Sequence, residues 1–172
     1  MSDYQRLRIP GACYFFTVVT WRRKPVFIDD ARVSLLREAL RKVKATRPFQ
    51  IDAMVILPDH LHCIWCMPDN DADYSGRWRE IKKAFSCQVD TTTNARNERL
   101  VWQRRFWEHT IRDADDWRRH VDYIHYNPVK HGLAQRPSDW PWSSFAGAVK
   151  KGWYDAGWGA TPPNHISDME HE

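Results

Sequence analysis

The chain has 172 residues, of which 42% are hydrophobic, and a formal net charge of +4. This length suits one domain with a full hydrophobic core, whereas the apolar runs are too short to cross a bilayer. The polar N-terminus lacks the apolar segment of a signal peptide, so we expect a cytoplasmic protein with reduced cysteines and no membrane partner.

The chain alternates between predicted strands and helices. Aromatic and β-branched residues predict strands at 14–21, 51–57, 61–67 and 108–111. Apolar residues at helical spacing predict helices at 30–46, 77–89 and 113–127, with Pro128 ending the last one. This order predicts an α+β fold: a ferredoxin-like βαββαβ core, with an antiparallel sheet and helices on one face, and an added C-terminal helix. We expect a single domain at 1–150 and a loosely ordered tail at 151–172.

Two histidines begin the third predicted strand. Pro58 and Asp59 form a predicted tight turn after an apolar run, and His60 and His62 follow with one apolar residue between them. Residues two apart on a strand share a face, and neutral imidazoles are common metal ligands. The pair therefore predicts half of a site for a divalent metal ion.

A tyrosine and an asparagine share one face of the last predicted helix. Tyr123 and Asn127 are four residues apart, which places their Cβ atoms about 5–6 Å from each other. If this helix lies across the strand, His60, His62 and Asn127 would bind a metal ion beside a nucleophilic Tyr123; Tyr126 points elsewhere and is the weaker candidate. Nitrogen and oxygen ligands together suit Mg²⁺ or Mn²⁺.

Such a site suits phosphodiester cleavage. A tyrosine phenol is a weak nucleophile at neutral pH because its ordinary pKa is about 10. A metal ion can polarise the phosphate and lower the cost of forming the phenolate. Attack by Tyr123 would leave a 5′-phosphotyrosine link and a 3′-hydroxyl, and the reverse step could rejoin strands.

Basic residues cluster along the chain, and several of its ten tryptophans lie among them. Proteins that bind single strands combine cations that hold phosphates with rings that stack on bases. The candidate DNA contacts are Arg22, Arg23, Lys24, Arg77, Arg79, Lys82, Lys83, Arg104 and Arg105. The neighbouring tryptophans are Trp21, Trp78, Trp102, Trp107 and Trp117, of which Trp78 has the helical spacing of a core residue.

The segment His60-Leu61-His62 resembles the HUH motif, histidine–hydrophobic–histidine, of single-tyrosine nucleases. More narrowly, residues 4–147 are similar to the REP-associated tyrosine transposases of bacteria. The matching stretches are 11–17, 57–65, 77–83, 105–112, 122–133 and 138–144.

This resemblance implies a ferredoxin-like fold and metal-dependent cleavage and joining of single-stranded DNA by a monomer. The implied substrates are hairpins of repetitive extragenic palindromic (REP) elements. His60 and His62 would ligate the metal ion, Tyr123 would be the nucleophile, and Asn127 would take the place of the third ligand.

Two other hypotheses remain open at this point. A non-catalytic module that binds DNA or RNA hairpins would explain the basic and aromatic residues alone. A zinc protein could use His60 and His62 together with Cys63 and Cys66, although two cysteines three apart on a strand point to opposite faces.

Overall fold

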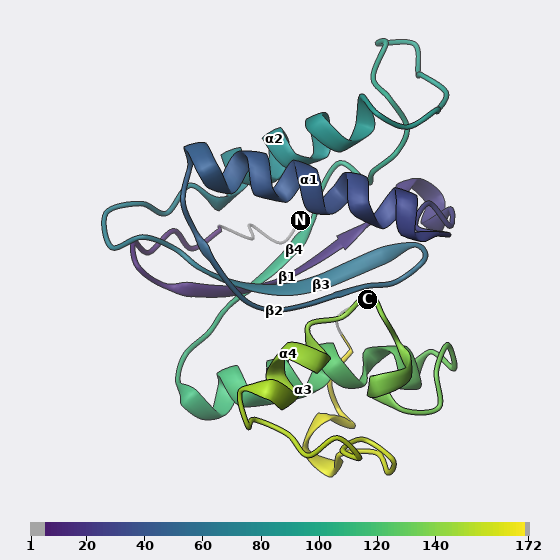
Figure 1. The fold of residues 1–172 in the computed structure, drawn as a ribbon. Coiled ribbons are helices and arrows are strands. Elements are labelled where there is room, and N and C mark those ends of the chain that lie inside the picture. The colour runs from purple at the N-terminus through teal and green to yellow at the C-terminus, as the bar shows by residue number, and fades with distance from the viewer. Residues whose placement is uncertain (1–5, 171–172) are drawn as a thin grey trace.

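The structure, a computed structural model, describes residues 6–170. A four-stranded antiparallel sheet has the order β2-β3-β1-β4. The strands are β1 (Cys13–Val19), β2 (Gln50–Ile56), β3 (His60–Cys66) and β4 (Trp107–Thr110). The α-helices are α1 (Asp30–Thr46), α2 (Tyr74–Ser86), α3 (Ala114–Lys130) and α4 (Phe145–Lys150). In Figure 1, α1 and α2 cover one face of the sheet and α3 and α4 the other, which confirms the α+β class and places the added helix opposite the first two.

Alternate residues of the two central strands belong to two hydrophobic cores. Tyr14, Phe16 and Trp65 pack in the core under α1 and α2, whereas Phe15 and Ile64 pack in the core under α3. This division follows from the two-residue period of a strand. By the same period, the two histidines at the start of β3 face α3.

Each of the three long helices begins at an aspartate. Asp29, Asp73 and Asp113 each accept a hydrogen bond from the backbone N–H three residues later. An N-cap of this kind satisfies one of the donors that the first turn of a helix leaves without a partner. The caps fix where α1, α2 and α3 start, and hence which side chains face the sheet.

The prediction that Pro128 ends the last helix is wrong, because α3 continues to Lys130. A proline removes one helical hydrogen bond, here the one to the carbonyl of Ile124, but its φ angle is compatible with a helix. The helix then continues for two residues after Pro128 and ends at Lys130. This extra length brings Lys130, seven residues after Tyr123, onto the face that Tyr123 occupies.

The cysteines differ from their predicted state. Cys13 and Cys66 lie opposite each other in the pairing of β1 with β3, and they form a disulfide. Cys63 is buried on the α1 and α2 side, where burial raises the pKa of its thiol. The zinc hypothesis is therefore wrong for this structure, since neither Cys63 nor Cys66 can join His60 and His62 at one ion.

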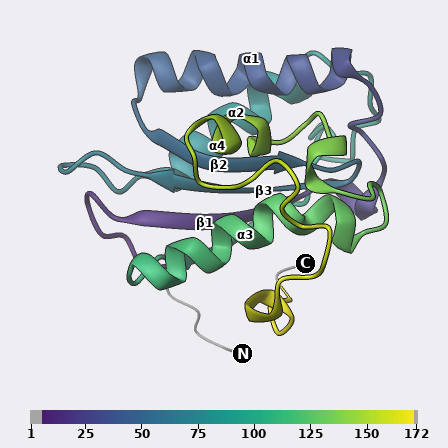
Figure 2. The ribbon, with the colours of Figure 1, turned by 60° about the horizontal axis from the view of Figure 1, so that its bottom comes forward.

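The segment after α4 packs against α3. Ile166 and Met169 are buried in the core under α3, and Arg119 donates hydrogen bonds to the Asp168 carboxylate. Figure 2 shows this segment, in yellow, near α3. The domain boundary at 150 and the loose order of the tail stay predictions. None of the helices in the described part of the chain is long and apolar enough to span a membrane.

Candidate functional site

His60 and His62 lie side by side at the start of β3. Pairing with β1 places His62 opposite Thr17 and His60 opposite Val19. The two ring centroids are 5.0 Å apart, and the side chains are 2% and 0% exposed. The turn before them is held because the backbone N–H and the hydroxyl of Thr20 both donate to the Asp59 carbonyl. The predicted pairing of the two imidazoles on one face is confirmed.

Neighbouring side chains orient both imidazole rings. His60 Nδ1 lies 2.6 Å from a carboxylate oxygen of Asp59, and His62 Nδ1 lies 2.9 Å from the Thr17 hydroxyl. Both bonds use Nδ1, so a metal ion would be bound through Nε2 of each ring. A carboxylate or hydroxyl behind a histidine is the usual support for a metal ligand, because it sets the tautomer and the ring orientation.

Electrostatics favour a neutral His60 beside an ionised Asp59. Burial lowers the pKa of His60, and this effect outweighs the opposing hydrogen bond to Asp59. Burial raises the pKa of Asp59, but its hydrogen bond to His60 and the charge of Arg23 lower it overall. The Arg23 guanidinium is 3.3 Å from the Asp59 carboxylate. A neutral imidazole is the form that binds a metal ion.

The turn that carries Arg23 is strained. This turn, the 3₁₀ segment Trp21–Arg23, holds Arg22 and Arg23 at φ angles of 53° and 52°. Left-handed backbone costs roughly 1–2 kcal/mol per non-glycine residue. Such strain is commonly retained where it positions a functional group, and here it sets Arg23 against Asp59.

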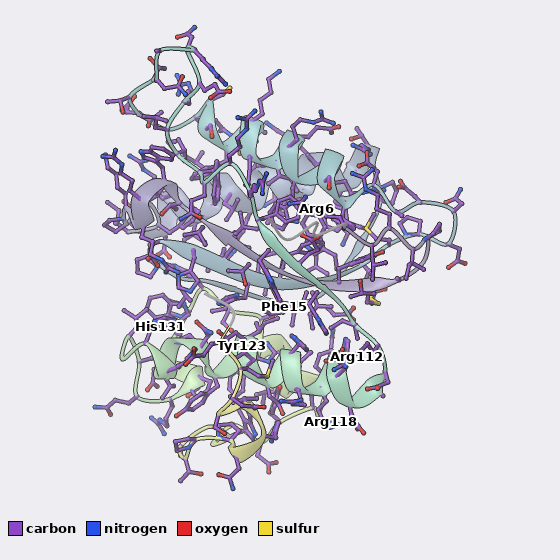
Figure 3. All side chains as sticks on the ribbon, turned by 180° about the vertical axis from the view of Figure 1, so that it is seen from behind. Arg6, Phe15, Arg112, Arg118, Tyr123 and His131 are labelled. Carbon is purple, nitrogen blue, oxygen red and sulfur yellow. A yellow bond between two sulfur atoms is a disulfide. The ribbon has the colours of Figure 1, made fainter. Side chains whose placement is uncertain are left out.

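Helix α3 places Tyr123 and Asn127 over the histidines. The Tyr123 ring is 5.3 Å from the His62 ring, and the His131 ring, eight residues later, is 5.1 Å from the His60 ring. Asn127 lies midway between these two contacts on the same helical face. Figure 3 shows Tyr123 on α3, and His131 just after the end of this helix, below Phe15 of the sheet. The structure therefore brings the four predicted site residues together.

The buried polar atoms of this region fit a metal ion. Asn127 is 0% exposed, and neither its Oδ1 nor its Nδ2 has a hydrogen-bond partner among the described residues. The same holds for Nε2 of His60. Burying such atoms without a partner costs about 1–3 kcal/mol each, which a bound ion would offset. Two imidazole nitrogens and one amide oxygen form a donor set that Mg²⁺ or Mn²⁺ accepts.

Lys130 contacts the predicted nucleophile. Its ammonium group donates a hydrogen bond to Tyr123 Oη at 3.3 Å. A cation at this distance stabilises a phenolate relative to a phenol. A helix that ends at 127, as the sequence predicts, does not include Lys130; the spacing of seven residues from Tyr123 is the signal that could have identified it. Tyr123 is 1% exposed, so a phosphate can reach it only after the groups that cover it shift.

A second group of ligand-type side chains joins β4 to α3. Atoms of His109, Asp116 and His120 lie within 4.8 Å of one another, close enough to hold a metal ion. However, His120 Nδ1 is 2.8 Å from the Asp116 carbonyl, which only accepts, so this nitrogen carries a proton. The two imidazole rings are also stacked, at 16°, and parallel rings cannot both aim a lone pair at one ion. We therefore interpret this group as a structural hydrogen-bonded contact between β4 and α3, and not as a metal site.

Several of the predicted DNA contacts border one cavity. It lies between α2 and the loop at 94–104 and has a volume of about 1000 Å³. Its basic lining residues are Arg79, Lys82, Lys83, Arg96, Arg99 and Arg104. Trp21, at the end of β1 that carries Arg22, Arg23 and Lys24, also lines this cavity. Arg22, Arg23, Lys24 and Arg105 are exposed.

The structure corrects the prediction for Arg77. This guanidinium is 1% exposed and donates to the carbonyls of Arg47, Pro48 and Asp73 and to the Asp71 carboxylate. A side chain so engaged cannot reach a phosphate. Charge in the sequence did not reveal that Arg77 serves as a buried anchor.

Lys82 is also partly withdrawn from solvent. Its ammonium donates to the carbonyl of Gln103, and burial lowers its pKa to about 8. Lys82 is thus a poorer phosphate ligand than its exposed neighbours Arg79 and Lys83. Trp78, at 1% exposure, is the core residue that its spacing predicted.

Comparisons with known proteins find related sequences along most of the chain. A family model described as "Transposase IS200 like" matches residues 10–127, which include His60, His62, Tyr123 and Asn127. The chain is 48% identical over 158 residues to the REP-associated tyrosine transposase of Escherichia coli K12, covering 92% of this chain and 91% of the relative. A relative from Haemophilus influenzae is 40% identical over 169 residues, 94% of this chain and 96% of the relative.

A solved structure gives the same result for the fold. It is described as a REP-associated tyrosine transposase bound to a REP hairpin, and it is 44% identical to this chain. The two superpose with a TM-score of 0.84 over 99% of this chain and 96% of the other.

Proposed function

Since the chain belongs to the REP-associated tyrosine transposases of the IS200-like transposase family, we propose that it is a metal-dependent endonuclease and strand transferase for single-stranded DNA. Its substrates are REP-type hairpins, and its intermediate is a covalent 5′-phosphotyrosine. The observation that carries this proposal is the position of Tyr123 over His62, on the same helical face as the buried, unsatisfied amide of Asn127.

Three residues of this site would bind the metal ion, and two others orient the imidazole ligands. Nε2 of His60, Nε2 of His62 and Oδ1 of Asn127 would hold Mg²⁺ or Mn²⁺. When bound, the ion supplies Lewis-acid polarisation of the scissile phosphate. Asp59 and Thr17 keep the two imidazoles in the orientation that ligation needs.

Tyr123 supplies the nucleophile. Its Oη forms a bond to phosphorus while the bond from phosphorus to the 3′ oxygen breaks, and that oxygen leaves with a proton as a 3′-hydroxyl. The Lys130 ammonium, 3.3 Å from Oη, stabilises the phenolate that attacks. One phosphoester replaces another, so the reverse reaction can join the protein-bound end to a 3′-hydroxyl without an external energy source.

The basic cavity supports a nucleic-acid partner. Exposed arginines and lysines bind phosphates and make affinity depend on salt. Arg79, Lys83 and Arg104 border the cavity, and Arg22, Arg23 and Lys24 lie at the end of β1 next to the turn of His60. The related solved structure holds a REP hairpin, which supports the same class of ligand for this chain. We propose that the chain acts as a monomer.

A denaturing gel tests this function. The purified chain is incubated with a labelled REP-type hairpin that has single-stranded flanks, in Mn²⁺ or Mg²⁺. We expect a labelled band at the mass of protein plus DNA for the wild type and for Tyr126→Phe, and none for Tyr123→Phe or in EDTA. Because the phenol contributes chemistry rather than affinity, Tyr123→Phe should still bind the hairpin on a native gel.

Two outcomes would contradict the proposal. An adduct that persists in Tyr123→Phe would exclude this nucleophile. Hairpin binding by the wild type without an adduct in either metal, across hairpins with different flanks, would favour the non-catalytic binding module.

A further inference from the structure

Two aromatic side chains of β4 form an open stack. Trp107 and His109 are two residues apart on this edge strand, so both point to the face that α3 covers. Their rings are almost parallel, at 6°, with centroids 6.1 Å apart. The Trp107 side chain is 39% exposed, whereas Trp78 and Trp102 are buried at 1% and 8%. Of the five tryptophans that the sequence places among basic residues, Trp107 is the most open to solvent, since Trp21 and Trp117 are half-buried and the other two are buried.

The separation of the two rings suits a third flat ring. Trp65 and Trp78, a closed stack in the core, have centroids 4.2 Å apart. Stacked bases follow each other at about 3.4 Å, so a base between two rings needs about 6.8 Å. The Trp107 and His109 centroids are 6.1 Å apart, which is the upper limit of the gap between the two ring planes. A base therefore enters once Trp107 moves outward by about 0.7 Å or more.

The inner wall of this stack is held in place. His109 Nε2 lies 2.8 Å from the Asp116 carboxylate, and the His109 ring stacks on His120 with centroids 4.7 Å apart. Asp116 in turn accepts from the backbone N–H of Arg112 at 2.9 Å, and its own N–H donates to Asp113. Because His109 is restrained on two sides, a base that enters needs to displace only the outer ring, Trp107.

The stack lies next to the proposed metal ligands. Trp107 pairs with Thr17 of β1, and the Thr17 hydroxyl is the group that bonds Nδ1 of His62. The Phe15 ring connects both regions, with its centroid 5.9 Å from Trp107, 5.4 Å from His62 and 6.0 Å from Tyr123. Only strand β1 separates Trp107 from the strand that carries both histidines.

We propose that one nucleobase of the single strand, adjacent to the scissile phosphate, stacks between Trp107 and His109 and thereby positions that phosphate. This inference rests on the proposed function, since it takes single-stranded DNA as the ligand. Stacking accepts any base, so the slot gives position rather than sequence specificity. Trp107 contacts the substrate but takes no part in bond making.

Fluorescence of 2-aminopurine tests the slot, because this base analogue is quenched when it stacks. The probe is a REP-type hairpin with single-stranded flanks that carries 2-aminopurine at one flank position at a time, without a metal ion so that no strand is cut. We expect one position to be quenched when the wild-type chain binds. Trp107→Leu keeps an apolar side chain without a flat ring and should lose this quenching, whereas Trp107→Phe should retain it.

Binding provides a second readout and a control. Trp107→Leu should bind the flanked hairpin about tenfold or more weakly and bind a hairpin without flanks as the wild type does. The control is Trp153→Ala, which removes a tryptophan of similar exposure, 40%, outside β4. It should leave the quenching and both affinities unchanged. The proposal is overturned if no position is quenched, or if Trp107→Leu and Trp153→Ala behave alike.

This test separates the slot from the nuclease activity. Quenching that depends on Trp107 in a chain that forms no covalent adduct would support the slot and contradict the proposed function. An adduct that depends on Tyr123, with quenching that ignores Trp107, would support the function and overturn the slot.

Discussion

Lys130 places a positive charge beside Tyr123, the proposed nucleophile. The ammonium lies 3.3 Å from Oη and 5.0 Å from the ring centroid. A hydrogen bond from a charged donor contributes about 1.5–3 kcal/mol. The ammonium therefore stabilises the attacking phenolate more than it stabilises the neutral phenol.

Replacing Lys130 should therefore slow the chemical step. We expect Lys130→Gln to lower the single-turnover rate of adduct formation by about tenfold to a hundredfold, with the affinity for the hairpin little changed. Lys130→Arg, which keeps the charge, should recover most of the rate. Lys150→Gln, at an exposed position of α4, serves as the control. Equal rates for Lys130→Gln and Lys150→Gln would show that the contact is incidental.

The sequence reveals the site where residue type and short spacing carry the signal. His60 and His62 follow from the strand period, and Tyr123 and Asn127 follow from the helix period. Thr17 escapes such reasoning because it meets His62 only through strand pairing, 45 residues away in sequence.

Reasoning from residue type and spacing also fails to identify buried charged side chains and residues with a left-handed backbone conformation. Arg77 looks like a surface cation in the sequence, but three backbone carbonyls and a carboxylate surround its guanidinium. Arg22 and Arg23 adopt the left-handed backbone conformation, which sequence reasoning expects at glycine and not at arginine.

At the scale of elements, the strands and long helices were predictable because each has a clear hydrophobic period. The helix predicted at 77–89 lies at Tyr74–Ser86, because its cap is Asp73 in the segment before it. The antiparallel sheet that the predicted βαββαβ order implies is observed, with the strand order β2-β3-β1-β4. The four-residue strand β4 was predicted at 108–111, one residue from its observed position. The helix α4 was not predicted, because its six residues are too few for a hydrophobic period to emerge. The position of α4 depends on tertiary contacts.

Arg77 connects three elements, so its loss should affect stability rather than DNA binding. It joins the start of α2 to the connection between α1 and β2. We expect Arg77→Met to lower the free energy of unfolding by about 1–3 kcal/mol, because it leaves backbone carbonyls and the partly exposed Asp71 carboxylate without their partner. Urea unfolding measures this change.

The neighbouring residue Arg79 provides the matched control. It is exposed at the basic cavity, so Arg79→Ala should change stability by no more than about 0.5 kcal/mol. If it contacts a phosphate, it should reduce the salt slope of hairpin binding by about 1. Equal stability losses in the two variants would contradict the anchoring role of Arg77.

At the scale of the whole molecule, the two faces of the sheet do different things. The face under α1 and α2 is filled with apolar and aromatic side chains, whereas the face under α3 carries the histidines, Tyr123 and the Trp107–His109 stack. The chain crosses from the first layer to the second after β4. Asp116 ties this crossing by accepting from His109 and from the backbone of Arg112.

This tie should make stability depend on pH at the acid end. Burial raises the pKa of Asp116, but its hydrogen bonds to Arg112 and His109 lower it to about 2. The folded value is below the unfolded one, about 3.9, so the contribution is present above about pH 4 and is lost as pH falls to about 2. Asp116→Asn should cost about 2 kcal/mol at pH 6, and the difference from wild type should shrink at pH 3. A difference in urea midpoint that is the same at both pH values would contradict this account.

The central claim is that α3 delivers Tyr123, and no other tyrosine, to the phosphate over His60 and His62. Trypsin cuts after Arg119 and Lys130 and releases one peptide that contains both Tyr123 and Tyr126. Fragmentation of this peptide by tandem mass spectrometry, after the covalent adduct has been formed and its DNA digested, assigns the phosphonucleotide to one ring. We predict that the added mass lies on Tyr123. Added mass on Tyr126, or on a peptide from elsewhere in the chain, would contradict the site described here.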